Sequence, residues 1–175
     1  MAFRPADARG IPNLLSYPDF FDYRKQNQAF EHLVSYRDAD FTLSGSQPPI
    51  QVPGQIVSWD LFLILGVQPQ LGCGFLPQEE EPGAHAVVLS HSLWTRRFGG
   101  DKRLLGKPAR INGAFFTVVG VAPAGFRFPV EAPAVELWVT LAEDSDARDQ
   151  RGSRMLEAVG RLKPGISPVQ ASESS

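Results

Sequence analysis

The spacing of apolar residues changes several times along this chain, and each change predicts a new element of secondary structure. The first clear element is DFFDYRKQNQAFEHLVSY, in which aromatic and aliphatic residues recur near one helical face. Ser16 and Pro18, just before it, are typical of a helix start. The pattern predicts a helix over residues 17–36, with an interruption near Asn27.

After this helix the apolar residues alternate with other residues, which is typical of strands. DFTLSG and PIQVPGQIV show the alternation, and VELWVTLA predicts a strand with one buried face. AVVLS is apolar throughout, as expected of a strand that is buried on both faces, and MLEAVGRLKPG is predicted as the last strand. Between them, SWDLFLILGV predicts a short buried helix with Ser58 as its N-cap and Gly66 as its stop.

Two stretches carry stronger local signals. In SHSLWTRRFGGD, Ser90 stands where a helix needs an N-cap, Trp94 and Phe98 form an apolar pair at a spacing of four, and two glycines end the helix. Asn112-Gly113 lies between two strand-like runs, which favours a tight hairpin turn with positive φ at both residues. The sequence therefore predicts a short helix followed by a hairpin.

Composition narrows the class of protein. The 175 residues are 43% hydrophobic and include 15 Pro, 16 Gly and 12 Phe, which favours one domain, or two small lobes, rich in short strands and turns. With 17 basic and 19 acidic residues the net charge is -2, which argues against a nucleic-acid partner. Cys73 is the only cysteine, so one chain can form neither a disulfide nor a thiolate metal cluster.

Candidate metal and cofactor chemistry is weak. The three histidines, His32, His85 and His91, lie in no metal-binding spacing, so we expect no metal site and no cofactor. The acidic run Glu79–Glu81 before Pro-Gly is more typical of solvated surface than of a calcium loop. No nearby Cys-His arrangement activates Cys73, and RFGGDKR is interpreted as a basic surface turn.

The Ser-His-Ser triplet raises an enzymatic alternative, a small hydrolase that uses Ser90 or Ser92 with His91 or His85. A catalytic serine and its histidine base usually come from different segments, because their side chains must converge, and the Gly-x-Ser-x-Gly pattern is absent here. A helix cap therefore accounts for the triplet better than catalysis, and we expect no catalytic residues. A stand-alone ligand-binding module is a third hypothesis, which requires an enclosed apolar cavity.

The order of the segments resembles the MacB-like periplasmic core domain of ABC transporter permeases. The most specific parts are LSHSLWTRRFGGD, the run INGAFFTVVGVAPAGF and the RLKPG turn, and the match covers residues 14–171. The resemblance implies an α+β fold, in which a porter-like α/β lobe carries an inserted, mainly β second lobe. Cys73 stands where many relatives carry a charged residue.

The resemblance also implies lobe boundaries. Residues 14–99 would form the first part of the porter-like lobe, residues 100–150 the strand-rich insertion, and residues 151–175 the return to the porter-like lobe. Residues 1–13 are expected to be a lead-in, either poorly ordered or foreign to the domain. The final SPVQASESS begins like a helix but ends after about two turns, so we expect a truncated lobe cut from a longer protein.

The function implied is mechanical. Such domains lie outside the inner membrane of bacteria, in the periplasm, and transmit ATP-driven conformational change to a substrate or partner. The implied partners are the membrane helices of the permease and a cytoplasmic ATP-binding domain or subunit. A second copy of the chain and a periplasmic adaptor protein are further candidates, whereas no nucleic acid is expected.

Overall fold

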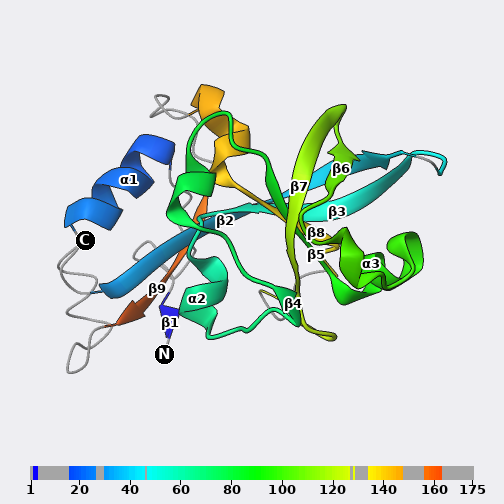
Figure 1. The fold of residues 1–175 in the computed structure, drawn as a ribbon. Helices are drawn as coiled ribbons and strands as arrows, with labels where there is room; N and C mark the ends of the chain where they lie inside the picture. The colour runs from blue at the N-terminus through cyan, green and yellow to red at the C-terminus, as the bar shows by residue number, and fades with distance from the viewer. Residues whose placement is uncertain are drawn as a thin grey trace. The chain divides into compact units, whose positions relative to one another are not determined.

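The computed structural model describes residues 2–3, 16–26, 30–45, 47–126, 128, 134–147 and 156–162. The chain divides into two compact units (Figure 1). Unit 1 comprises Met1–Arg37 and Asp144–Ser175, and unit 2 comprises Asp38–Glu143. Helices and strands occur together in the mixture expected, and the α+β class is confirmed. The lobe boundaries expected at 99/100 and 150/151 stay a prediction.

Unit 1 contains helix α1 (Tyr17–Gln26) and a small antiparallel sheet in the order β1-β9-β2. Its strands are β1 (Ala2–Phe3), β9 (Glu157–Leu162) and the first part of β2 (Phe30–Ser44). Ala2 pairs with Arg161 and Phe3 with Gly160, so these two residues of the expected lead-in form part of the sheet. The predicted helix start in SPVQASESS lies outside the described residues.

The predicted helix over residues 17–36 is wrong in its second half. Residues from Phe30 onward belong to β2, which pairs with β9 in register from His32 opposite Arg161 to Tyr36 opposite Glu157. The helical spacing of Phe30 and Val34 coincides with this strand by chance, and the ladder to a distant segment outweighs the local period. The predicted interruption at Asn27 lies outside the described residues.

A bidentate ion pair ties the end of this unit's β2 segment to its returning chain. Arg37 donates from Nε to Oδ2 of Asp144 at 2.5 Å and from Nη2 to Oδ1 at 2.6 Å. Both side chains are largely covered, at 27% and 13% exposure, so the pair is shielded more than a surface salt bridge is. The same unit buries Phe20 and Val34 completely.

Unit 2 is built on a mixed sheet in the order β3-β8-β5-β7-β4, with β6 pairing both β7 and the end of β2. The strands are β3 (Ile50–Val57), β4 (Leu71–Gly72), β5 (Ala86–Leu89), β6 (Pro108–Ile111), β7 (Ala114–Val121) and β8 (Leu137–Thr140). The helices are α2 (Leu61–Leu65), α3 (His91–Phe98) and the short 3-10 turns η1 (Pro77–Glu80), η2 (Lys102–Leu104) and η3 (Leu141–Ala147), the last of which continues into unit 1.

Strands β5 and β8 form the centre of this sheet. All four residues of each are buried, which confirms the expectation for AVVLS. VELWVTLA was predicted to be a strand with one buried face. This is wrong for β8, because Trp138 and Thr140 on the other face are also buried, whereas Glu136 on that face, just before β8, is half-buried. Trp138 packs on Phe62 and Phe126 with ring centroids 5.6 and 5.4 Å away, and the hydroxyl of Thr140 donates to the Glu79 carbonyl at 2.6 Å.

Helix α2 ends as the sequence predicts but begins differently. Gly66 has φ 69° and closes the helix in the left-handed conformation. The N-cap is Asp60 rather than Ser58, because Ser58 forms a turn in which its carbonyl accepts from the N–H of Leu61.

The hairpin β6–β7 confirms the prediction for Asn112-Gly113, whose φ values are 52° and 81°. Asn112 is also fixed to β2, since its Oδ1 accepts from the N–H of Thr42 at 2.8 Å and its N–H donates to the Thr42 carbonyl at 2.9 Å. β6 therefore has partners on both sides, β7 and the end of β2 (Figure 1).

Gly120 lies where β4 and β7 approach each other closely. A Cβ at this position would overlap the backbone carbonyl of Cys73, and the backbone cannot move aside as a flexible side chain can. We expect Gly120→Ala to lower the free energy of unfolding by about 2–4 kcal/mol, measured by urea denaturation. Gly74→Ala is the matched control, because its Cβ would lie 3.4 Å from the nearest atom, in Phe62, and should cost under about 1 kcal/mol. Equal effects of the two changes would contradict this account.

Candidate functional site

The Ser-His-Ser triplet forms the start of α3. Ser90 has extended backbone angles, and its Oγ accepts a hydrogen bond from the N–H of Leu93 at 3.0 Å, so the predicted N-cap is confirmed. Gly99 ends the helix with φ 66°, and Trp94 donates its indole N–H to the Asp101 carbonyl at 3.1 Å. Ser90, Trp94 and Gly99 thus each have a structural role at an end of the helix.

The hydrolase hypothesis requires a serine, a histidine and a carboxylate within hydrogen-bond reach. His91 Nδ1 instead meets Nε2 of Gln70 at 2.7 Å, and His85 Nδ1 meets Oε1 of Glu143 at 3.1 Å. Ser92 accepts from Arg96 at 3.1 Å. Within the described part of the chain, neither serine of the triplet is hydrogen bonded to His85 or His91, so the predicted arrangement does not form.

A cavity of about 300 Å³ borders the same triplet. Its wall is mostly apolar, with Phe126 and Trp138 among the lining residues, and its polar groups include His91 and Glu136. Both of these are engaged by other side chains, His91 by Gln70 and Glu136 by the guanidinium of Arg96 at 2.7 Å. The polar groups therefore stabilise the protein itself rather than converge on a vacant position.

The remaining candidates from the sequence lie apart. Glu79 closes the η1 turn by accepting from the N–H of Leu76, and Glu80 is buried, with Oε2 accepting from the N–H of Trp59 at 2.8 Å, so the acidic run is not simply solvated surface. Cys73 is exposed. His32 lies in β2 opposite Arg161. Among the described residues, no group of three His, Cys, Asp or Glu side chains is placed to hold a metal ion.

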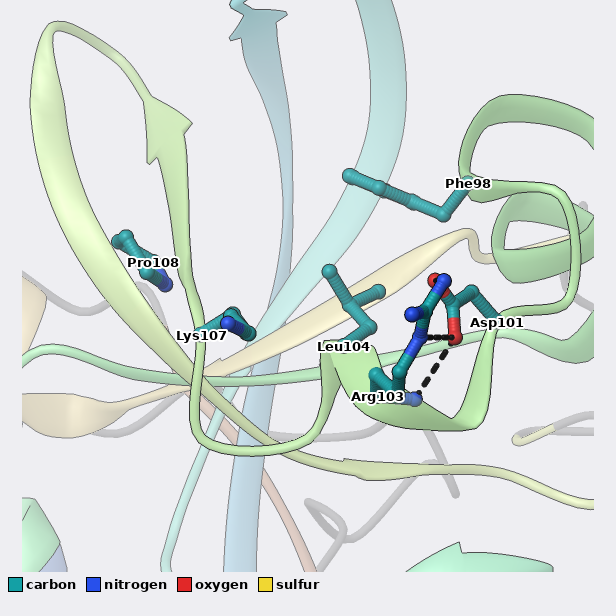
Figure 2. Close-up of a pocket in the computed structure, with 6 residues that line it drawn as sticks. All are labelled: Phe98, Asp101, Arg103, Leu104, Lys107 and Pro108. Carbon is teal, nitrogen blue, oxygen red and sulfur yellow. Dashed lines mark hydrogen bonds and ion pairs between the residues drawn. The ribbon is translucent and has the colours of Figure 1, made fainter.

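Two adjoining hollows near the hairpin were missed by sequence reasoning. The first, of about 460 Å³, lies between the η2 turn and β6 and is the one drawn in Figure 2. The second, of about 440 Å³, lies along the edge of the hairpin. Phe98 and Pro108 line both hollows. We call the two hollows together the basic groove, because their lining includes the cationic residues Arg97, Arg103, Lys107 and Arg110.

Figure 2 shows how the first hollow is lined. Phe98 from the end of α3 and Leu104 from η2 both extend into the space, and Lys107 and Pro108 lie on the β6 side. On the other side Asp101 accepts from the N–H of Arg103 at 2.9 Å and from its guanidinium at 3.2 Å. The side-chain hydrogen bonds between the two residues are the main reason why the pKa of Asp101 is lowered and the pKa of Arg103 is raised. The bond from the backbone N–H of Arg103 lowers the pKa of Asp101 further.

Comparison with known proteins decides the family. A family model described as the MacB-like periplasmic core domain matches residues 2–174. The chain belongs to this family of MacB-like periplasmic core domains. The resemblance carried by LSHSLWTRRFGGD and the hairpin run is thereby confirmed. Comparison with curated protein sequences gave no match.

Solved structures share the fold of this MacB-like domain. The extracellular domain of the noncanonic ABC-type transporter YknZ from Gram-positive bacteria is 14% identical, with a TM-score of 0.72, over 98% of this chain and 88% of that one. The periplasmic region of MacB from Actinobacillus actinomycetemcomitans is 15% identical, with a TM-score of 0.71, over 99% and 78% of the two chains. In the described part of this domain, no helix has the length and apolar character of a membrane span.

Ser90 should matter for stability rather than for chemistry. We expect Ser90→Ala to lower the free energy of unfolding by about 1 kcal/mol, because the N–H of Leu93 loses its acceptor. Ser92→Ala is the matched control, since Ser92 is exposed and its hydroxyl accepts from an exposed arginine, and it should change stability by under about 0.5 kcal/mol. Denaturant unfolding measures both. A larger loss for Ser92→Ala than for Ser90→Ala would refute the cap assignment.

The ion pair between Asp101 and Arg103 leads us to expect that the pKa of Asp101 changes when Arg103 is replaced. Arg103→Gln removes the guanidinium donors but keeps the backbone N–H, so the pKa of Asp101 should rise part of the way toward its ordinary value. Because the pKa is lowered in the folded protein, the pair is intact at neutral pH and is lost as pH falls through that lowered pKa. Carboxyl-carbon NMR titration measures the shift. Lys102→Gln is the control, and an equal shift there would contradict the assignment.

Proposed function

We propose that this chain is the extracytoplasmic domain of an ABC-type transporter permease, which passes nucleotide-driven movements of membrane helices to a substrate or partner outside the membrane. The observation that carries the proposal is the family match over residues 2–174. The structural likeness to the periplasmic region of MacB and to the extracellular domain of YknZ supports it.

The course of the chain also supports a mechanical role. Unit 2 lies in sequence between the two stretches of unit 1, so unit 1 is interrupted by an insertion. The chain passes from unit 1 into unit 2 within a single strand, β2, which begins in unit 1 and ends in unit 2. In the proposed role, unit 1 would respond to the membrane helices and carry unit 2 with it.

The proposed partners follow from this role. They are the membrane helices of the same permease and a cytoplasmic ATP-binding domain or subunit, and the proposed location is the periplasmic side of the inner membrane of a bacterium. A second copy of the chain and a periplasmic adaptor protein complete the set. The Ser-His geometry described above gives the hydrolase alternative no support.

Cys73 offers a direct test of transmission. It is exposed and is the only cysteine of the chain, so it can carry a nitroxide label in a full-length permease whose other cysteines are replaced by serine. In the permease assembled with its ATP-binding subunit in nanodiscs, we expect the distance between labels on two copies to change between the nucleotide-free and ATP-bound states. Pulsed electron paramagnetic resonance measures the distribution.

The control for this experiment is an assembly with an ATP-binding subunit that cannot bind nucleotide, in which the distribution should stay constant when ATP is added. A distribution that is the same in every nucleotide state of the active assembly would refute transmission through this domain. If each assembly carried only one label, the assembly would contain one copy of the chain, and the proposed pairing of two copies would be refuted.

A further inference from the structure

The basic residues of unit 2 are concentrated in one stretch. Residues 38–143 contain seven Lys and Arg against ten Asp and Glu, a net charge of -3. Six of the seven basic residues fall between 96 and 110, so the rest of the unit is strongly acidic. Four of those six line the basic groove, together with one acidic residue, Asp101, which is already paired with Arg103.

The cations of the groove are available to an outside partner to different degrees. Arg97 donates to the carbonyl of Pro48 at 2.6 Å, which positions its side chain without neutralising its charge. Among the described residues, Lys107 and Arg110 form no salt bridge with a carboxylate, and both are exposed. Cations that line a hollow attract an anionic partner more strongly than the same charges spread over a convex surface.

Apolar side chains accompany these cations. Phe115 is 66% exposed, although a large aromatic side chain is usually covered, and the guanidinium of Arg110 lies 5.8 Å from its ring centroid. Phe98 and Leu104 are half-buried and line the first hollow. An arginine beside an exposed aromatic is the side-chain composition that protein interfaces favour at their centre.

We propose that the basic groove is a docking site for an acidic segment of a protein partner, one that alternates carboxylates with apolar side chains. The carboxylates would meet Lys107, Arg110 and Arg97, while the apolar side chains would pack on Phe98 and Phe115. This proposal describes the kind of partner that the transmission role proposed above would act on. It rests on that role for its biological context, but not for the binding itself.

A protein segment fits the groove better than an anionic membrane does. Headgroups of a bilayer form a broad negative surface that would also face the acidic remainder of unit 2, whose net charge is -3 in spite of the cations. A peptide segment is narrow enough to contact the hollows alone. The two hollows also have apolar linings, which headgroups would leave uncovered.

Peptide binding by the 175-residue chain tests the proposal. The probe is a fluorescein-labelled octapeptide in which four glutamates alternate with two leucines and two phenylalanines, and its control replaces every glutamate by glutamine. We expect the acidic peptide to bind with an affinity that falls at least about fivefold when NaCl rises from about 50 to about 300 mM. The double variant Lys107→Glu with Arg110→Glu should weaken binding by about tenfold or more. Fluorescence anisotropy measures both effects.

Lys25→Glu is the control for a charge reversal outside the groove, because Lys25 is an exposed cation on α1, away from the groove in sequence. It should leave binding within about twofold. Phe115→Ser should also weaken binding, and since the side chain is exposed it should leave thermal unfolding unchanged. Thermal unfolding of every variant separates lost binding from lost folding.

Three results would overturn the proposal. These are equal binding of the acidic and glutamine peptides, equal effects of Lys25→Glu and the groove variants, and binding to phosphatidylglycerol vesicles without binding to the peptide, which would assign the groove to the membrane. None of these results depends on nucleotide or on transport. Failure here therefore leaves the test of transmission through Cys73 unaffected.

Discussion

The indole N–H of Trp138 is the constraint on which unit 2 depends. Trp138 is 1% exposed at the centre of β8, so its N–H needs a partner inside the core. Gln55 lies opposite Trp138 in the parallel ladder between β3 and β8, and its Oε1 accepts at 3.1 Å. The amide nitrogen of Gln55 then donates to Asp38 at 3.1 Å and to the Phe128 carbonyl at 3.0 Å. A register shift of one residue would leave a buried polar group without a partner.

This central pair determines where the groove lies. β8 pairs with β5, and β5 leads directly into α3, so the buried strands fix the start of the helix whose end contributes Phe98. β5 also pairs with β7, the strand that carries Phe115 next to the hairpin turn. The two sides of the groove are thus held by neighbours of one buried strand, while the lining itself contributes little to the core. The exposed side chains of this lining, such as Lys107, Arg110 and Phe115, can therefore serve recognition.

Sequence reasoning succeeds where a few adjacent residues determine the structure. The cap at Ser90 and the turn at Asn112-Gly113 each follow from local backbone chemistry, and both are confirmed. It fails where contacts with distant segments determine the structure. The segment from Phe30 onward has helical spacing but forms a strand that pairs with β9. Trp138 was assigned to a polar face, but the rings of Phe62 and Phe126 cover it. The family resemblance supplies the α+β class that these local signals leave open.

The basic groove could not be predicted from composition, because net charge is an average over the whole chain. A net charge of -2 over 175 residues describes the field far from the protein, whereas a partner at contact distance meets only charges within about 10 Å, the screening length in moderate salt. Within that range the stretch 96–110 is cationic, and folding gathers it because Arg97 of α3 and Arg110 of β6 line the same hollow. An acidic chain can therefore carry a binding site for an acidic partner. Composition argues against an extended nucleic-acid surface, but it leaves a local anionic contact open.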